Sequence, residues 1–122
     1  MGYGKTFGEF IIGKRKEMDM SARQVALAVG MTPEYMCDIE KDRKSAISDE
    51  YVKGFIRVLG LSGEELELFY DLLAIAQKTV SADLPEYIME NELVRAAIRT
   101  AKKNRVPDEK WVKFIDEIIK KE

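Results

Sequence analysis

The chain has 122 residues, 46% of them hydrophobic and 34% charged, which is ordinary for a globular protein of about one domain. It contains no histidine and one cysteine, Cys37, so the residues that build zinc sites, catalytic triads and disulfide frameworks are missing, and we expect no metal, no cofactor and no enzymatic activity. The formal net charge of −2 does not show whether the protein binds nucleic acid, because proteins bind DNA through a local basic surface and not through their total charge.

The first predicted helix begins at Thr6. The side chains of Thr6 and Glu9 form a capping box, and the helix runs to about Met18. Residues at near-helical spacing give this helix a core face: Phe7, Phe10, Ile11 and Met18.

Two short helices follow in quick succession. A second capping box, Ser21 with Gln24, opens one of them, and Gly30 stands where a left-handed residue ends it. Thr32 then caps the next, with Pro33 in the first helical position, where its missing N–H costs nothing. The residues expected to face the core are Val25, Ala28 and Val29 before the turn, and Met36 and Ile39 after it.

The third helix ends near Lys41 or Asp42, and KDRKSA at 41–46 predicts a basic loop. Ser48 caps a fourth helix, which Gly60 ends.

The fifth predicted helix begins with a third capping box, SGEE at 62–65, and runs to about Gln77. Its apolar residues form two stripes, Leu66, Phe69, Tyr70 and Leu73 in one, and Leu68, Leu72 and Ile75 in the other. Because a helix that is apolar on two faces is buried on two sides, we expect one stripe to face the first four helices. The other faces either the carboxyl segment or a second subunit.

The polar stretch TVSADLPE at 79–86 is linker-like and predicts a domain boundary after residue 78. Beyond it, one helix carries Leu93, Val94, Ala97, Ile98 and Ala101, and a last one carries Trp111, Ile115, Ile118 and Ile119. No sustained alternation of apolar and polar residues predicts a strand. We therefore expect an all-α fold, with a five-helix domain over 1–78 and a two- to three-helix carboxyl segment over 79–122.

The stretch 21–41 has the features of a helix-turn-helix motif, which needs a small residue where the helices touch, a glycine at the turn and apolar anchors on the second helix. Ala26 supplies the small contact and Gly30 the turn. The alternative is a pair of core helices in a generic bundle, with Gly30 as an ordinary cap. That alternative does not explain why the second helix presents four residues outward together: Pro33, Glu34, Cys37 and Asp38.

The stretch MSARQVALAVGMTPEYMCDIEKDRK resembles the phage-repressor-like (Cro/C1-type, XRE) helix-turn-helix family, and the resemblance covers about residues 6–61. The matching positions are Met20-Ser21, Val25-Ala26, Gly30, Thr32, Ile39-Glu40 and Arg43-Lys44. The tail also looks like the carboxyl segment of some longer members. The resemblance implies a lambda repressor-like fold and double-stranded DNA as the partner, with the helix that starts at Thr32 entering the major groove.

The resemblance also implies roles for individual residues. Its base-facing positions are Pro33, Glu34, Cys37 and Asp38, the positions nearer the DNA backbone are Thr32, Tyr35 and Lys41, and the loop positions are Arg43 and Lys44. The helix start at Ser21 offers a phosphate anchor through its free N–H groups and its dipole. Many members place glutamine where this chain has Ala22, and Arg23 substitutes for it here. Many also have glycine where this chain has Asp42, which tolerates the left-handed conformation at a modest cost.

Several side chains of this surface keep two interpretations. Glu34 and Asp38 either accept from cytosine N4, each good contact being worth roughly 1–3 kcal/mol of discrimination, or are a first-turn charge and a solvated charge. Tyr35 either binds a phosphate or covers the edge of the core, and Cys37 is either a small residue near the groove or a redox sensor. The cations expected to carry affinity are Arg23, Lys41, Arg43 and Lys44, with Lys14 and Arg15 as additions.

These features together predict a dimeric, sequence-specific transcriptional regulator, a repressor that occupies an inverted-repeat operator. The candidate dimer surfaces are Leu68, Leu72 and Ile75 in the fifth helix and Trp111, Ile115 and Ile118 in the last, unless the tail folds back and buries both. Two alternatives are a DNA-binding antitoxin whose tail holds a toxin or regulatory protein, and a protein-interaction module that does not bind DNA. No run approaches the ~18 apolar residues of a membrane span, and the amino end has no signal-peptide core, so we expect a cytoplasmic protein without a membrane partner.

Overall fold

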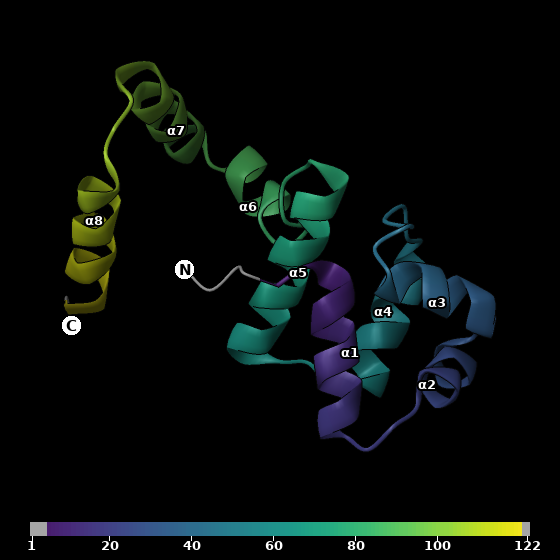
Figure 1. Cartoon of the computed structure of the whole chain (residues 1–122). Coiled ribbons are helices and arrows are strands. Elements are labelled where there is room, and N and C mark those ends of the chain that lie inside the picture. The colour runs from purple at the N-terminus through teal and green to yellow at the C-terminus, as the bar shows by residue number, and fades with distance from the viewer. Residues whose placement is uncertain (1–4, 121–122) are drawn as a thin grey trace. The chain divides into compact units, whose positions relative to one another are not determined.

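The computed structural model describes residues 5–120, which form eight helices joined by turns and loops, with no strand in that range (Figure 1). The first four residues of the amino end, included in the signal-peptide expectation, lie outside this range. None of the described helices has the length and apolarity to cross a membrane. The chain divides into two compact units, the first ending at Leu84 and the second beginning at Pro85.

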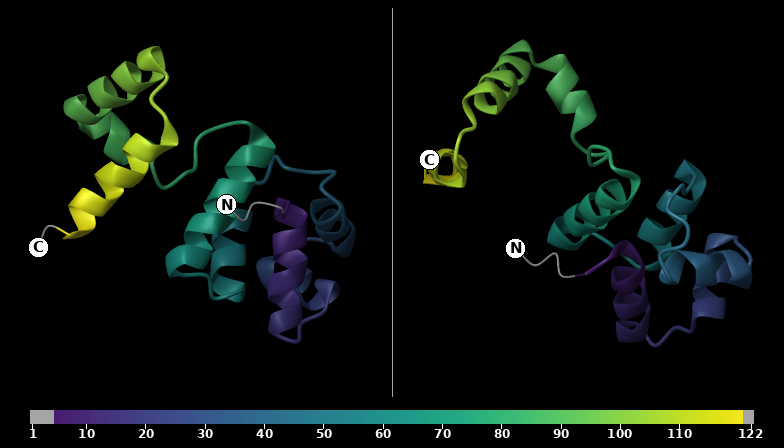
Figure 2. Two further views of the ribbon diagram at one scale, coloured as in Figure 1. Left: turned by 60° about the vertical axis from the view of Figure 1, so that its left-hand side comes forward. Right: turned by 45° about the horizontal axis from the view of Figure 1, so that its top comes forward.

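The first unit contains five helices and the second contains three. Their bounds are α1 (Phe7–Glu17), α2 (Ala22–Val29), α3 (Pro33–Glu40), α4 (Asp49–Val58), α5 (Gly63–Gln77), α6 (Pro85–Glu90), α7 (Glu92–Asn104) and α8 (Asp108–Lys120). In the first unit α2 packs against α3 and α4, while α1 lies between α3 and α5 (Figure 2). The all-α fold, with five helices followed along the chain by three more, is the predicted one.

Side-chain caps start the first four helices where the sequence predicts them. The Thr6 hydroxyl accepts from the Glu9 N–H at 3.1 Å, and the Thr6 N–H donates to the Glu9 carboxylate at 3.0 Å. Ser21 and Gln24 form the same reciprocal pair. Each box satisfies two N–H groups that a helix start otherwise leaves without a partner.

The predicted capping box at 62–65 is wrong. Ser62 occupies the cap position of α5, but its side chain makes no capping hydrogen bond. The backbone turns left-handed at Gly63, with φ at +58°, so the first residue of α5 lacks the helical geometry on which a box depends.

An aromatic cluster forms the centre of the first unit. The ring of Phe69 on α5 lies 5.3 Å from that of Phe7 on α1 and 6.4 Å from that of Phe55 on α4. Both Phe55 and Phe69 are fully buried, as are Ile11, Val25, Met36, Ile39 and Leu59. Contacts of this kind, repeated over many buried apolar groups, supply most of the free energy that holds α1 to α5 together.

Two residues predicted to face the core do not. Met18 follows the last residue of α1 and is 40% exposed, because the chain has already turned away from the core there. Ala28 is exposed as well. The buried side of α2 runs through Val25 and Ala26, and Ala28 stands on the helix face away from it.

The two apolar stripes of α5 are not two separate surfaces. Leu72, assigned to the second stripe, is only 3% exposed and packs in the core with Phe69 and Leu73. Leu68 is half-buried against the same core, and Ile75 alone of this stripe is largely exposed, at 61%. Within the first unit α5 is therefore buried along one broad face.

Candidate nucleic-acid interface

The turn between α2 and α3 is fixed by backbone and side-chain bonds together. Gly30 has φ at +99°, a conformation that L residues with side chains rarely adopt, and its N–H donates to the Ala26 carbonyl at 2.8 Å. Met31 donates to the same carbonyl at 2.9 Å. Two residues later the Thr32 hydroxyl accepts from the Tyr35 N–H at 3.1 Å and starts α3. The turn between the two helices therefore favours glycine at position 30, because a residue with a side chain would be strained at this φ.

The inner faces of the two helices hold α3 at a defined angle. Val25 and Ala26 on α2 and Met36 and Ile39 on α3 are all fully buried, as the sequence predicts. The small side chain of Ala26 lets the two helices approach closely, while the longer side chains anchor α3 in the core. The outer face of α3 is thereby held in one orientation.

The far end of α3 packs directly on the backbone of α1. A side chain at Gly8 would place its Cβ 2.3 Å from the carbonyl oxygen of Glu40, which no packing adjustment accommodates. This contact positions the end of α3 and the start of the loop that follows, and it requires glycine at position 8.

Asp42 has a role that the sequence did not reveal. Its φ is +59°, the left-handed conformation expected where relatives carry glycine. Its carboxylate also accepts from the Thr6 hydroxyl at 2.6 Å and from the Gly8 N–H at 2.9 Å. Asp42 therefore ties the basic loop to the start of α1, where a negative charge is favoured by the helix dipole.

A second link joins α1 to α3. The Arg15 guanidinium donates to the Glu40 carboxylate at 2.7 and 3.2 Å and to the Met20 carbonyl at 3.3 Å. Both side chains of the pair are largely buried. The hydrogen bond with Glu40 raises the pKa of Arg15 above its ordinary value, so the pair stays charged.

Lys14 is also engaged within the first unit. Its ammonium donates to both carboxylate oxygens of Glu65 at 2.9 Å and lies 3.5 Å from a carboxylate oxygen of Glu17. The hydrogen bond with Glu65 is the main cause of a raised Lys14 pKa. Carboxylates of the first unit thus already pair with Lys14 and Arg15, the two cations expected as additional phosphate contacts.

The residues expected to meet bases do share the outer side of α3. Glu34 is exposed, while Pro33, Cys37 and Asp38 are half-buried. Asp38 lies 3.7 Å from the Arg43 guanidinium, so its negative charge is partly compensated on this surface. Within the described residues Glu34 has no comparable ion pair, and its position in the first turn suits the helix dipole.

Tyr35 braces the basic loop. Its hydroxyl donates to the Ala46 carbonyl at 3.3 Å, its ring meets Tyr51 edge-on at 5.2 Å, and the Lys44 ammonium lies 5.0 Å from its ring centre. The loop that carries Lys44 is thus packed on the side of α3, with a cation–π contact at its centre.

Four exposed cations lie in α2 and in the stretch that follows α3. Arg23 near the start of α2 and Lys41 after α3 form no ion pair within the described range, and Arg43 and Lys44 follow in the loop. The Ser21 hydroxyl accepts from the Gln24 N–H and keeps its own proton for another acceptor. Cations and hydroxyl donors are the groups that hold phosphate oxygens.

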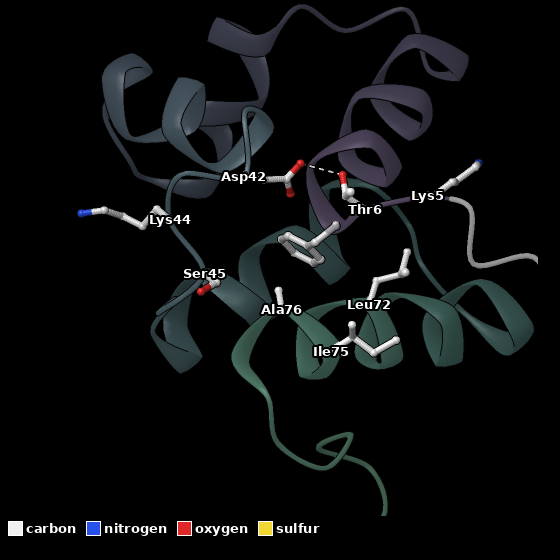
Figure 3. Close-up of a pocket in the computed structure, with 9 residues that line it drawn as sticks. Lys5, Thr6, Asp42, Lys44, Ser45, Leu72, Ile75 and Ala76 are labelled. Atoms are coloured by element: carbon white, nitrogen blue, oxygen red, sulfur yellow. Dashed lines mark hydrogen bonds between the residues drawn. The ribbon is translucent and has the colours of Figure 1, made fainter.

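A hollow of about 420 Å³ lies behind the basic loop (Figure 3). Leu72, Ile75 and Ala76 of α5 form one wall, and the hydrogen-bonded pair of Thr6 and Asp42 forms another. The Gln77 amide crosses to the Ser45 carbonyl at 2.6 Å. The loop is therefore tied to α5 as well as to α1.

Residues 11–66 match a helix-turn-helix family model (HTH_3). Within that match, the residues have the helix-turn-helix arrangement that is typical of the phage-repressor-like (Cro/C1-type, XRE) family, which supports the resemblance seen in the sequence. No curated protein and no solved structure matched the chain significantly.

This family is one of DNA-binding regulators, generally without enzymatic activity, so the chain carries a DNA-binding helix-turn-helix domain. The match includes α2 and α3 with their turn and ends within α5, and it leaves the whole second unit outside.

Proposed function

We propose that the protein is a sequence-specific transcriptional regulator that reads the major groove of double-stranded DNA with α3. The observation that carries this proposal is the rigid mounting of α3. Its inner face is fully buried, both of its ends are held by hydrogen bonds or close packing, and its outer face lies open between exposed cations. Recognition of base edges needs a reader that is held in one orientation before it binds.

Base reading falls to the outer residues of α3, namely Pro33, Glu34, Cys37 and Asp38. The Glu34 carboxylate is suited to accept from cytosine N4, a contact worth roughly 1–3 kcal/mol of discrimination. Asp38 is offset by Arg43 at 3.7 Å, so its charge repels the DNA backbone less than an isolated carboxylate would. The two acidic residues thus favour a C·G-containing site over other sequences.

We assign phosphate binding to exposed cations and to the starts of two helices. Arg23, Lys41, Arg43 and Lys44 supply charge, and the starts of α2 and α3, at Ser21 and Thr32, supply donors and a favourable helix dipole. Tyr35 contributes by holding Lys44 and the loop in place, because its hydroxyl proton is already given to Ala46.

A single helix reads only a few base pairs, so we propose a cytoplasmic homodimer that binds an inverted repeat with half-sites about one helical turn apart. Occupation of such an operator within a promoter blocks transcription, which makes the protein a repressor. Apolar residues beyond the matched domain are the candidates for pairing: Ile75 and Leu68 in α5, and Trp111, Ile115 and Ile118 in α8.

The first test is to incubate the purified protein with sheared DNA of its own genome at about 150 mM salt, where exposed charges are screened beyond ~8 Å, and to sequence what stays bound. We expect sharp enrichment of a few sites with inverted half-sites. Uniform retention that vanishes with salt, or no retention, contradicts sequence-specific reading.

Two matched double variants distinguish phosphate contacts at specific positions from an effect of net charge on DNA affinity. Replacing Arg43 and Lys44 together by alanine removes two phosphate contacts, and affinity for every enriched site should fall alongside a salt slope that is smaller by about 2. Replacing Lys16 and Lys53, two exposed cations elsewhere in the first unit, removes the same charge and should leave affinity within about twofold. Equal effects from both pairs would mean that only net charge matters.

A further inference from the structure

The second unit, which begins at Pro85, does not enclose a core. None of the described side chains of α6, α7 and α8 is buried. The unit has no cysteine, since the single one of the chain is Cys37. Its three helices therefore need an apolar partner.

The helices of this unit line a groove. An apolar hollow of about 900 Å³ lies between α7 and α8, and α6 adds Tyr87 to its wall. The large side chains that line it are Leu93, Val94, Ile98, Trp111, Phe114 and Ile118. Leu93 is 84% exposed, so this lining is open to water in the isolated unit.

The apolar surface of α8 continues past the groove. Val112, Ile115 and Ile119 do not line the hollow, yet they share the apolar side of α8 with Trp111 and are at least half exposed. Each copy of the unit thus offers a hollow and, next to it, a ridge of β-branched side chains. A hollow and a ridge on one unit are the requirement for a two-fold interface, where the same patch serves both partners.

The charges beside these two surfaces are complementary. Asp108 and Asp116 lie four residues before and after Val112, so acidic groups border the ridge. On α7, Lys102 follows Ile98 by four residues, so a basic group borders the groove. Packing the ridge of one copy into the groove of another brings these opposite charges together, whereas groove against groove does not.

The exposed area also fits a second copy. Nine large side chains, the six named on α8 with Tyr87, Leu93 and Ile98, each leave on the order of 100 Å² in water, or roughly 900 Å² together. A stable interface buries about 800 Å² on each partner. The first unit of the same chain offers only scattered large apolar residues, such as Leu27 and Ile75 on different helices, as a competing cover.

We propose that the second unit is a pairing module, in which the ridge of α8 from each copy fills the apolar groove between α7 and α8 of the other. This deepens the proposed function, because it rests on the dimer proposed there and names the surface that makes it. It also makes the folding of the second unit dependent on protein concentration.

Trp111 is the only tryptophan of the chain and lines the groove, so its fluorescence reports on this unit alone. We expect the full-length protein to sediment as a dimer at micromolar concentration, and the Trp111 emission to shift to longer wavelength on dilution as the dimer dissociates. A monomer with short-wavelength emission at every dilution would overturn the proposal, because the groove would then be covered by its own chain. A monomer with solvent-exposed emission throughout would overturn it too, leaving the groove to a different protein such as a toxin.

Charge placed on the ridge tests the geometry. Ile115→Glu should weaken dimerisation by roughly 100-fold or more, since each dimer carries the buried charge twice. The control is Lys113→Glu, which introduces the same side chain two residues away, on the opposite side of α8, and should change the dimer dissociation constant by less than about threefold. Equal effects would contradict a ridge-in-groove interface.

The two proposals fail separately. The Arg43→Ala, Lys44→Ala protein should remain a dimer while losing DNA. A wild-type dimer that enriches no DNA sites would remove the proposed function and leave the pairing module standing. Sharp enrichment of operators by a protein that is monomeric in solution and on DNA would remove the pairing module and leave sequence-specific DNA reading standing.

Discussion

The two units of this chain are built from amphipathic helices of similar length, yet they use their apolar faces differently. In the first unit the faces of α1 to α5 converge on Phe55 and Phe69, and the connections between helices are held by Arg15–Glu40 and Asp42–Thr6. In the second, the faces of α7 and α8 border an open groove. An amphipathic helix needs a partner face, and the comparison shows that the partner can lie within the chain or be left for another molecule.

The largest predicted difference in the free energy of unfolding is between two isoleucines, one buried in the first unit and one exposed in the second. Ile39→Ala removes a fully buried side chain behind the outer face of α3 and should lower the free energy of unfolding by about 2–5 kcal/mol. Ile119→Ala, at 71% exposure, should leave the unfolding of the first unit unchanged and act only on dimerisation. Urea unfolding followed by circular dichroism at two protein concentrations measures both, and equal losses would erase the distinction between the units.

The next largest effect on the free energy of unfolding concerns the close packing of α1 on α3. Gly8→Ala should cost about 1–3 kcal/mol or more, because its Cβ would meet the Glu40 carbonyl at 2.3 Å. Gly13→Ala lies on the same helix with nothing within 4 Å of its Cβ and should stabilise by about 0.5–1 kcal/mol through helix propensity. The sign of the change in urea midpoint distinguishes the two, and a stabilising Gly8→Ala would contradict the close approach.

Substitutions at two aspartates with the same backbone conformation distinguish the contribution of the side chain from that of the backbone. Asp42 and Asp19 both have φ at +59°, so glycine relieves the same strain at each. Asp19→Gly should be neutral or stabilise by a few tenths of a kcal/mol. Asp42→Gly should destabilise by about 1 kcal/mol net, because it loses the bonds to Thr6 and Gly8. Thermal unfolding of both variants tests this, and identical shifts would show that the Asp42 carboxylate contributes nothing.

The smallest effect concerns Lys14 at high pH. Its folded pKa is raised above 10.5, chiefly by its hydrogen bond with Glu65. The stability from this pair is therefore fully present below the unfolded pKa and is lost as pH rises through the folded one. Lys14→Met should unfold with a flatter pH dependence between about pH 10 and 12 than wild type, while Lys16→Met should keep the wild-type slope. Parallel curves for both variants would mean that the pair does not couple to folding.

Sequence reasoning found what depends on neighbours along the chain. The capping boxes at Thr6 and Ser21 and the left-handed Gly30 follow from residues no more than four apart, and all three are confirmed. It failed at Ser62, because the positive φ of the next residue is set by how α5 enters the core. Leu72 was placed on a separate face for the same reason, since helical spacing alone does not say how wide a face the core covers.

By itself, therefore, the sequence determined the helices, the helix-turn-helix and the family resemblance of the first unit, because periodicity and caps act over one or two turns. Only the tertiary structure decided which charged side chains are paired within the first unit. Arg15 and Glu40 are 25 residues apart, and Thr6 and Asp42 are 36 apart, so no local pattern links them. Their pairing comes from the packing of α1 on α3, which neutralises these charges, whereas Arg23 and Lys41 stay exposed.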